Sequence, residues 1–123
     1  VLLLPAAFTY TTGLAHWELL LRARAVENQC YVVASAQGGK HESGRRTFGH
    51  SMIIDPWGDV LAVLPEGEGV VSAQLSGERL ASLRAKMPAL QHRLLSIYVY
   101  IDTKRLPEKF GKIKSFRWPY FMV

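Results

Sequence analysis

The strongest hydrophobic pattern of the chain lies in residues 11–37 and predicts one helix followed directly by one buried strand. On a helical wheel the apolar residues occupy two opposite faces: Leu14, Trp17, Leu20 and Leu21 on one, and Ala15, Leu19 and Val26 on the other. A surface helix needs only one apolar face. We therefore expect this helix, over residues 14–28, to be covered on both sides.

Polar residues in the same helix give two further expectations. Arg24 and Asn28 continue the face of Trp17, where a buried charge or amide needs hydrogen-bonding partners. Glu18 precedes Arg22 by one turn, which is the favourable order for an exposed ion pair. After Asn28 the pattern changes to a continuous apolar run at residues 30–36, which predicts a strand covered on both faces.

The remaining segments predict an α/β fold with a mixed sheet and two main helices. The expected strands cover residues 1–8, 31–36, 50–54, 60–64 and 70–75, and residues 37–49 are expected to form a loop. Asp55, Pro56 and Gly58 have the spacing of a type I turn, which makes the strands on either side of them a hairpin.

The helix ends carry recognisable signals. Thr11 or Thr12 is the expected cap of the first helix. Ser76 is the expected cap of a second helix, which carries Leu80, Leu83 and Met87 on one face and ends at Pro88.

The positive charge of the chain is concentrated near its end. Residues 1–94 contain nine Lys/Arg and eight Asp/Glu, whereas residues 95–123 contain six and two. The first part therefore gives no electrostatic reason to expect nucleic acid as a partner. Its longest apolar run is too short to span a bilayer, so we expect no membrane association. A single cysteine suits a reducing compartment and predicts a cytoplasmic protein, or a mitochondrial one if a longer form has a transit peptide.

Residues 95–123 differ in composition from the rest. A short β-like run at residues 96–101 precedes lysines spaced among aromatic residues, which are Phe110, Phe116, Trp118, Tyr120 and Phe121. Such mixtures are found in segments that bind nucleic acid or membrane surfaces, but no motif accompanies this one. We interpret it as an unrelated basic and aromatic tail that follows a domain at residues 1–94, with a binding segment as the alternative.

The chain begins inside the hydrophobic run of residues 1–8 and has no initiator methionine. A free strand of this composition leaves apolar surface and backbone groups without partners. We therefore expect the chain to be a fragment of a larger sheet protein.

Several segments together resemble one known family. They are PAAFTYTTG, AHWELLLRARAVENQCYVVASAQ, GKH, GHSMIIDPWGDVLA and LRAKMPALQHR. In this order they are similar to the C-terminal half of nitrilase-superfamily carbon–nitrogen hydrolases, and most similar to the deaminated-glutathione amidase branch, with the omega-amidases next. The resemblance implies a partial α-β-β-α sandwich that forms homodimers through helices, here the helix at residues 14–28.

The resemblance also implies a chemistry. The family hydrolyses small carboxylate-bearing amides, of the deaminated glutathione or α-keto acid amide type, to an acid and ammonia. It uses a cysteine nucleophile, a glutamate base and a lysine that stabilises the tetrahedral intermediate, with no cofactor. In the family all three residues lie upstream of the segment that Val1 begins. We therefore expect no catalytic residue in this chain and no activity from it alone. Cys30 is expected to be a core residue, because it lies where a helix passes into an apolar strand.

Phe8, Thr9 and Thr12 are the candidate substrate-pocket residues. They follow the C-terminal end of a buried strand, where α/β folds commonly bind ligands. In the family the corresponding loop borders the active-site pocket. The alternative interpretation is a core phenylalanine beside a helix-capping threonine.

Lys40, Arg45 and Arg46 form a basic loop that can attract a carboxylate substrate, with a solvated loop as the alternative. The four histidines, His16, His41, His50 and His92, lack the spacing of a zinc site, so we expect no bound metal and hydrogen-bonded or solvated side chains. His50 begins an apolar strand and is the one most expected to be buried with a hydrogen-bond partner.

Three functions follow from these observations. The favoured one is an amidase of which this chain is an inactive part. The second is a non-catalytic relative that acts by dimerisation or association. The third is a binding module that uses the basic tail.

Overall fold

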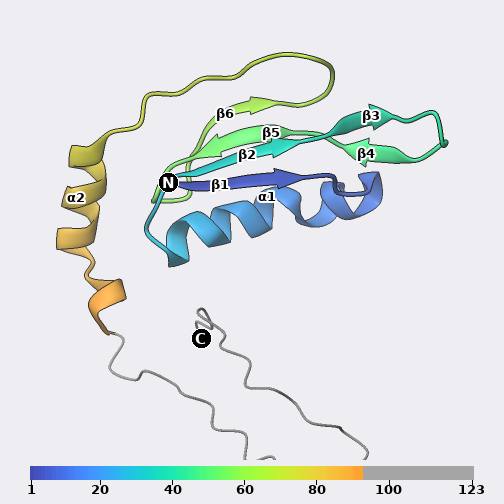
Figure 1. Cartoon of the computed structure of the whole chain (residues 1–123). Helices are drawn as coiled ribbons and strands as arrows, with labels where there is room; N and C mark the ends of the chain where they lie inside the picture. Colours follow the sequence, from blue (N-terminus) through green and yellow to red (C-terminus); the bar gives the residue numbers. More distant parts are fainter. Residues whose placement is uncertain (93–123) are drawn as a thin grey trace, which may run out of the picture. The chain divides into compact units, whose positions relative to one another are not determined.

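The computed structural model describes residues 1–92, in which a four-stranded mixed sheet packs one face against a long helix (Figure 1). The strands are β1 (Leu2–Ala6), β2 (Val32–Ala36), β5 (Ser51–Ile54) and β6 (Val60–Leu64), hydrogen-bonded in the order β1-β2-β5-β6. β1 runs parallel to β2, and the other pairs are antiparallel. The predicted α/β class, mixed sheet and two helices are confirmed, and the stretch at residues 95–123 lies outside the described residues.

The core lies between the sheet and helix α1 (Tyr10–Glu27). Trp17, Leu21 and Ala25 of α1 are each at most 2% exposed and pack against Val32 and Ile54 of the sheet. Gly13 belongs to the same buried line, and a side chain there has no room, since an ideal Cβ would lie 2.2 Å from Phe48 Cβ. Small residues at both ends of this line and large ones between them therefore bring α1 close to its neighbours.

The buried line on α1 differs from the predicted face. Leu14 and Leu20 are 68% and 42% exposed, although they were expected beside Trp17. Arg24, expected at a buried position, is exposed and pairs with Glu27 instead. The reason is geometric: buried positions recur every four residues, while the helix turns every 3.6, so the contact line drifts around the helix. By the last turn it has moved away from Arg24.

Other local expectations for α1 have mixed outcomes. The exposed ion pair between Glu18 and Arg22 is confirmed, at 3.3 Å. Asn28 is half-buried, and its Nδ2 donates to the carbonyl of Arg24 at 2.9 Å. The expected start of the helix is wrong, because Thr9 is the N-cap residue rather than Thr11 or Thr12, and the Gly13 N–H already donates to the Thr9 carbonyl at 2.8 Å. Gly13, expected directly before the helix, lies within it and packs against Phe48.

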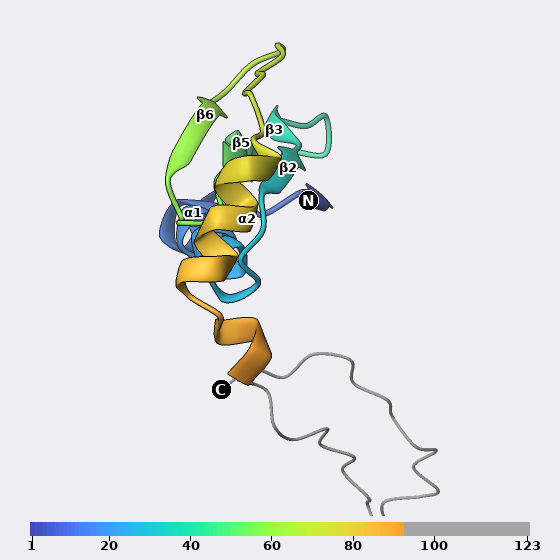
Figure 2. The same ribbon diagram turned by 90° about the vertical axis from the view of Figure 1, so that its left-hand side faces the viewer.

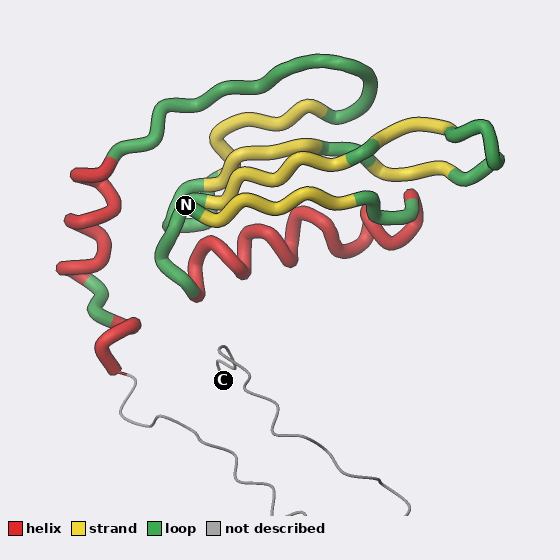
Figure 3. Tube along the Cα trace, viewed as in Figure 1, coloured by secondary structure: helices red, strands yellow, loops and turns green. Residues whose placement is uncertain are grey.

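Two strand predictions are wrong. The expected loop at residues 37–49 contains a hairpin of β3 (Gly38–Lys40) and β4 (Arg46–Phe48), with Gly39 opposite Thr47. The expected strand at residues 70–75 pairs with nothing in the described part of the chain, and Figure 3 shows the whole connection after β6 as loop. Within the described residues no other strand lies beside this segment to pair with its backbone. Alternation of apolar residues alone does not form the hydrogen bonds of a sheet.

The second face of the sheet is only partly covered. The register aligns Leu3 with Val33, and Val33 with Ile53, on the side away from α1. Ile53 is 7% exposed, but Leu3 is 71% exposed. The prediction that the second strand is covered on both faces is therefore met only on the α1 side within residues 1–92.

Helix α2 (Gly77–Lys86) stands across the end of the sheet at which β1 begins, and a short 3₁₀ helix, η1 (Ala89–His92), follows it (Figures 1 and 2). The predicted cap is confirmed, because Ser76 Oγ accepts a hydrogen bond from the Arg79 N–H at 3.0 Å. No residue of α2 is buried. Polar contacts attach it at both ends: Tyr31 Oη donates to the Ser76 carbonyl and accepts from its N–H, and Gln29 Nε2 donates to the Met87 carbonyl at 2.6 Å.

Helix α2 is also attached by an ion pair between Arg79, near its start, and Asp55 in the turn between β5 and β6. The carboxylate is 1% exposed and accepts hydrogen bonds from the N–H groups of Trp57 and Asp59, and from Nε and Nη2 of Arg79. Burial raises the pKa of the Asp55 carboxyl, but the hydrogen bonds from the turn backbone and from Arg79 outweigh burial and lower that pKa below its ordinary value of 3.8. The predicted turn is confirmed by the Gly58 N–H, which donates to the Asp55 carbonyl at 3.0 Å.

Candidate functional site

The three candidate pocket residues lie where β1 ends and α1 begins. Phe8 is half-buried, and its ring packs against the indole of Trp17 with the centroids 4.9 Å apart. Thr9 and Thr12 are exposed, and Thr9 Oγ1 donates to Thr12 Oγ1 at 2.8 Å. The junction therefore presents two linked hydroxyl groups to solvent beside an aromatic ring held by the core. Their contact with a substrate stays a prediction.

Strand β4 fixes this junction from the side. The carbonyl of Phe8 accepts a hydrogen bond from the Phe48 N–H at 3.0 Å, and Thr9 forms an isolated antiparallel bridge with Thr47. Thr47 is 2% exposed, and its hydroxyl lies 2.8 Å from Nε2 of His41. Backbone bonds to a neighbouring strand hold the residues after β1 more rigidly than a free loop does.

The three basic residues of the hairpin lie in different surroundings. Arg45 is exposed, and its Nη2 donates to the carbonyl of Ala7 at 3.2 Å, which brings a positive charge to the end of β1. Arg46 lies over the ring of Tyr10, 3.6 Å from its centroid, and pairs with Glu66 at 2.9 Å. Lys40 stands opposite Arg46 in the hairpin and has no ion pair within residues 1–92. Of these three side chains, Arg45 is thus the one that contacts the end of β1.

His50 has the hydrogen bond expected for it, but it is half-buried rather than buried. Its ring stacks on Phe48 with the centroids 3.8 Å apart, and Nδ1 donates to the Phe48 carbonyl at 2.8 Å. The backbone of His50 has a φ of 58°, an uncommon value for a residue with a side chain. Its carbonyl accepts a hydrogen bond from Nε1 of Trp17 at 2.8 Å. These contacts link the packed rings of Phe8 and Trp17 to the start of β5.

The match to protein families covers most of the described part of the chain. A family model described as carbon-nitrogen hydrolase matches residues 3–85. The chain belongs to the carbon–nitrogen hydrolase family. The resemblance seen in the sequence is therefore confirmed.

Individual members of the carbon–nitrogen hydrolase family show how far the similarity extends. The deaminated glutathione amidase of Bos taurus is 51% identical over 98 residues, which is 80% of this chain and 30% of the bovine protein. The Caenorhabditis elegans nitrilase and fragile histidine triad fusion protein NitFhit is 44% identical over 119 residues, or 97% of this chain and 26% of the worm protein. That alignment runs into residues 95–123, so the boundary after residue 94 stays a prediction.

Solved structures of carbon–nitrogen hydrolases have the same fold. The crystal structure of C. elegans NitFhit has a TM-score of 0.66 at 50% identity, over 75% of this chain and 23% of that one. Saccharomyces cerevisiae Nit3, described as a member of branch 10 of the nitrilase superfamily, has a TM-score of 0.69 at 35% identity, over 77% of this chain and 36% of that one. This chain thus spans between about a quarter and about a third of the length of these relatives.

Among the other candidates in this carbon–nitrogen hydrolase chain, Cys30 is half-buried rather than fully buried, and its backbone N–H donates to the Ala25 carbonyl at 3.1 Å. Within residues 1–92 its thiol has no hydrogen-bonded base. His16 and His92 are exposed, and residues 1–92 contain no cluster of three or more histidine, cysteine or acidic side chains suited to a metal ion. In the same described range no helix is both long and apolar enough to pass through a bilayer.

The sequence patterns did not indicate the contacts that Thr47 and Ala7 make at the end of β1. Both act through contacts between the hairpin and the end of β1, and residues 37–49 gave no strand pattern because the glycines and arginines there mask the alternation. The signal that was present is Thr47 and Phe48, a short β-forming pair inside a polar segment.

Proposed function

We propose that this chain supplies one wall of the substrate pocket in an amidase that hydrolyses small carboxylate-bearing amides to an acid and ammonia. The observation that supports the proposal is the juxtaposition of Phe8, Thr9, Thr12 and Arg45 at the end of β1. A ring, two hydroxyl groups and a cation suit a small polar molecule with a carboxylate at one end. Relatives named deaminated glutathione amidase suggest the class of amide, with α-keto acid amides as close alternatives.

Each residue has a role that follows from its contacts. Phe8 is fixed by Trp17 and gives an apolar boundary on one side. The hydroxyl groups of Thr9 and Thr12 share one hydrogen bond and keep further capacity to donate or accept. Arg45 gives long-range attraction for a carboxylate, since its guanidinium has one described contact, to the neutral carbonyl of Ala7.

The proposed chemistry requires a cysteine nucleophile, a glutamate base and a lysine from outside the described residues. Cys30 is the single cysteine of the chain and is half-buried at the end of α1, at the opposite end of that helix from Thr9. We therefore assign no catalytic role to residues 1–92. A reducing compartment such as the cytoplasm suits a cysteine enzyme of this kind.

The test begins with the source transcript, read upstream of the codon for Val1. The longest open reading frame that includes residues 1–123 is then expressed and assayed for ammonia release from α-ketoglutaramate. We expect Arg45→Gln to raise KM about tenfold with little change in kcat, because the cation acts on binding rather than on the reacting bond. Lys40→Gln is the matched control, because it removes the same charge from the same hairpin but has no described contact with Ala7. We expect it to leave KM unchanged.

Two results would contradict the proposal. One is an open reading frame product that releases no ammonia from any carboxylate-bearing amide. The other is equal behaviour of Arg45→Gln and Lys40→Gln. As a separate check, the 123-residue chain alone is expected to release no more ammonia than its Cys30→Ala variant.

A second candidate function is association without catalysis, and the outer face of α1 favours it. Leu19 is 67% exposed, and Val26, on the same side of the helix, is 41% exposed. We propose that this face forms a homodimer by pairing with the same face of a second copy. Glu18 and Arg22, which pair within the helix at 3.3 Å, carry opposite charges on this face, so a twofold axis that passes between them places each beside the opposite charge of the second copy.

The dimer is tested by sedimentation. We expect Leu19→Asp to give monomers at concentrations where the parent chain is dimeric, because a carboxylate would then be buried in an apolar interface. Leu3→Asp is the matched control, since Leu3 is 71% exposed on the far face of the sheet. A parent chain that sediments as a monomer, or a control that dissociates equally, would overturn the interface.

A further inference from the structure

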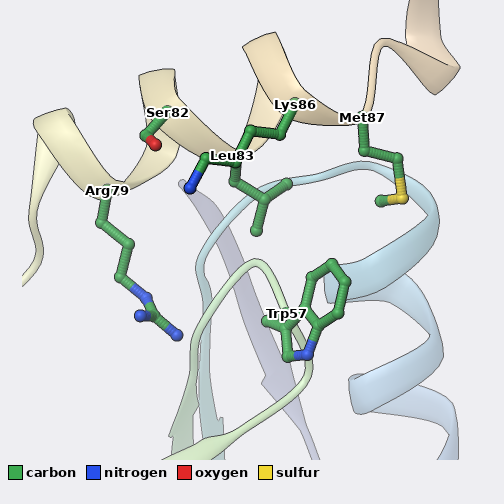
Figure 4. A pocket seen from close by; sticks show the side chains of 6 residues that line it. All are labelled: Trp57, Arg79, Ser82, Leu83, Lys86 and Met87. Carbon is green, nitrogen blue, oxygen red and sulfur yellow. The ribbon is translucent and has the colours of Figure 1, made fainter.

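A groove lies between α2 and the turn that follows β5. It has a volume of about 580 Å³ and is lined by Trp57, Arg79, Ser82, Leu83, Lys86 and Met87. Trp57 is 59% exposed, and Figure 4 shows the side chains of Leu83 in α2 and of Met87 just after it directed towards the indole. An exposed tryptophan beside two apolar side chains is a surface on which a flat ring can stack.

The groove lies at the other end of the sheet from Thr9. Ile54, directly before the turn, pairs with Val32, and Val32 pairs with Leu2 at the start of β1. Phe8 and Thr9 follow the opposite end of β1. A ligand in this groove is therefore not the substrate proposed above, and the inference does not depend on that proposal.

The charge of the groove has one sign. Its lining includes Arg79 and Lys86 and no acidic side chain. Figure 4 shows the ammonium group of Lys86 and the guanidinium of Arg79 on the same side, with the indole on the other. Arg79 is bound through Nε and Nη2 to Asp55 and lies 3.6 Å from a carboxylate oxygen of Asp59, but Lys86 has no ion pair within residues 1–92. A negatively charged group is therefore the complement that the groove lacks.

The walls of the groove are held in place before any ligand arrives. Asp55 binds both the turn backbone that carries Trp57 and Arg79 of α2, so one carboxylate sets the spacing of the two walls. At the far end of α2, Gln29 Nε2 donates to the Met87 carbonyl, and Arg84 Nε donates to the Gln29 carbonyl at 3.1 Å. Fixed walls reduce the ordering cost of binding.

We propose that this groove binds a small aromatic carboxylate, with its ring on Trp57 and its carboxylate beside Lys86 and Arg79. The volume is in the range of small-molecule sites, and the separation of an apolar side from a cationic side matches the two ends of such a ligand. The ring buries the indole face, and the carboxylate gains charge-assisted hydrogen bonds from Lys86.

The experiment is calorimetric titration of the 123-residue chain with 2-naphthoate and with 2-naphthamide, which has the same shape without the charge. We expect the amide to bind about tenfold more weakly than the carboxylate, the loss typical of one charged hydrogen bond. Lys86→Gln is expected to weaken naphthoate about tenfold and to leave naphthamide unchanged. Trp57→Ala is expected to remove binding of both.

Two control variants locate the ligand. Lys40→Gln removes a lysine from the hairpin and is expected to change nothing. Leu19→Ser tests a second groove, of about 660 Å³, in which Trp57 and Leu19 are both lining residues. We expect the affinity for naphthoate to be unchanged in Leu19→Ser, which assigns the ligand to the groove on the α2 side of Trp57. Circular dichroism of every variant checks that it is folded.

Four outcomes overturn the proposal. One is no measurable binding of naphthoate, and another is equal binding of naphthoate and naphthamide with no effect of Lys86→Gln. The third is loss of binding in Leu19→Ser but not in Lys86→Gln, which assigns the ligand to the other groove. If a second copy of the chain fills the groove instead, naphthoate affinity falls as protein concentration rises, and this also overturns it.

Discussion

Asp55 Oδ2 accepts a hydrogen bond from Nε of Arg79 at 2.8 Å, and this contact joins two walls that are 24 residues apart in the chain. The acceptor is buried in a tight turn, whereas the Arg79 side chain is 53% exposed. The carboxylate also holds two backbone N–H groups of its own turn. One side chain thus shapes the turn and anchors α2.

We expect Asp55→Asn to lower the free energy of unfolding by about 1–2 kcal/mol, because the amide keeps an acceptor for the turn but loses the charged bond to Arg79, which solvent partly screens. Urea denaturation measures the change. Asp59→Asn is the matched control: its carboxylate is 62% exposed and 3.6 Å from Arg79, so we expect almost no effect. Equal losses from both variants would contradict the assigned role of Asp55.

The lowered pKa of Asp55 predicts the direction of a pH dependence. Because its carboxyl titrates below the ordinary value of 3.8 in the folded chain, its stabilising contribution is complete above that value and is lost as the pH falls through the folded pKa. We expect the stability difference between the parent chain and Asp55→Asn to be constant near neutral pH and to shrink in acid below the ordinary value. Urea midpoints across an acid series test this, and a difference that grows with acidity would refute it.

Gly13 is predicted to be intolerant of a side chain. Gly13→Ala places a methyl group 2.2 Å from Phe48 Cβ, so either α1 or β4 must move. We expect a loss of about 1–3 kcal/mol in the free energy of unfolding, the usual cost of overpacking. Gly77→Ala is the control, since nothing lies within 4 Å of a Cβ there, and it is expected to be neutral or slightly stabilising. If the two variants have the same melting temperature, the close contact between Gly13 and Phe48 is absent.

The two helix caps are predicted to differ in strength. Ser76 Oγ accepts the Arg79 N–H at 3.0 Å, whereas the side chain of Thr9 makes no capping hydrogen bond to α1. We expect Ser76→Ala to destabilise α2 by about 1 kcal/mol and Thr9→Ala to have a smaller effect on α1. Hydrogen exchange of the amides in each helix measures both. A larger effect at Thr9 would mean that its hydroxyl turns towards the helix in solution.

The existence and type of the main elements follow from local patterns. The helix around Trp17, the turn at Asp55 and the cap at Ser76 each depend on residues that are neighbours in the chain. The resemblance to carbon–nitrogen hydrolases was visible for the same reason, because it is carried by continuous segments.

What the sequence did not reveal depends on tertiary contacts. Gly13 in the first turn of α1 packs closely on Phe48 of β4, and the hairpin is formed by pairing between glycine-rich β3 and β4. The position of Arg45 over the Ala7 carbonyl requires that hairpin. The ion pair of Asp55 and Arg79 joins a turn to a helix that are separated in the chain by β6 and a connection without regular structure. No periodic pattern in the sequence could therefore predict it.

The polar attachment of α2 has a consequence for how the chain comes apart. Because none of its residues is buried, α2 can detach without exposing the core around Trp17. Its attachment points, Gln29, Tyr31 and Asp55, are far away in sequence, so α2 docks only after the sheet has formed. A protease that cuts the connection between β6 and α2 is therefore expected to release the helix while the sheet and α1 remain folded.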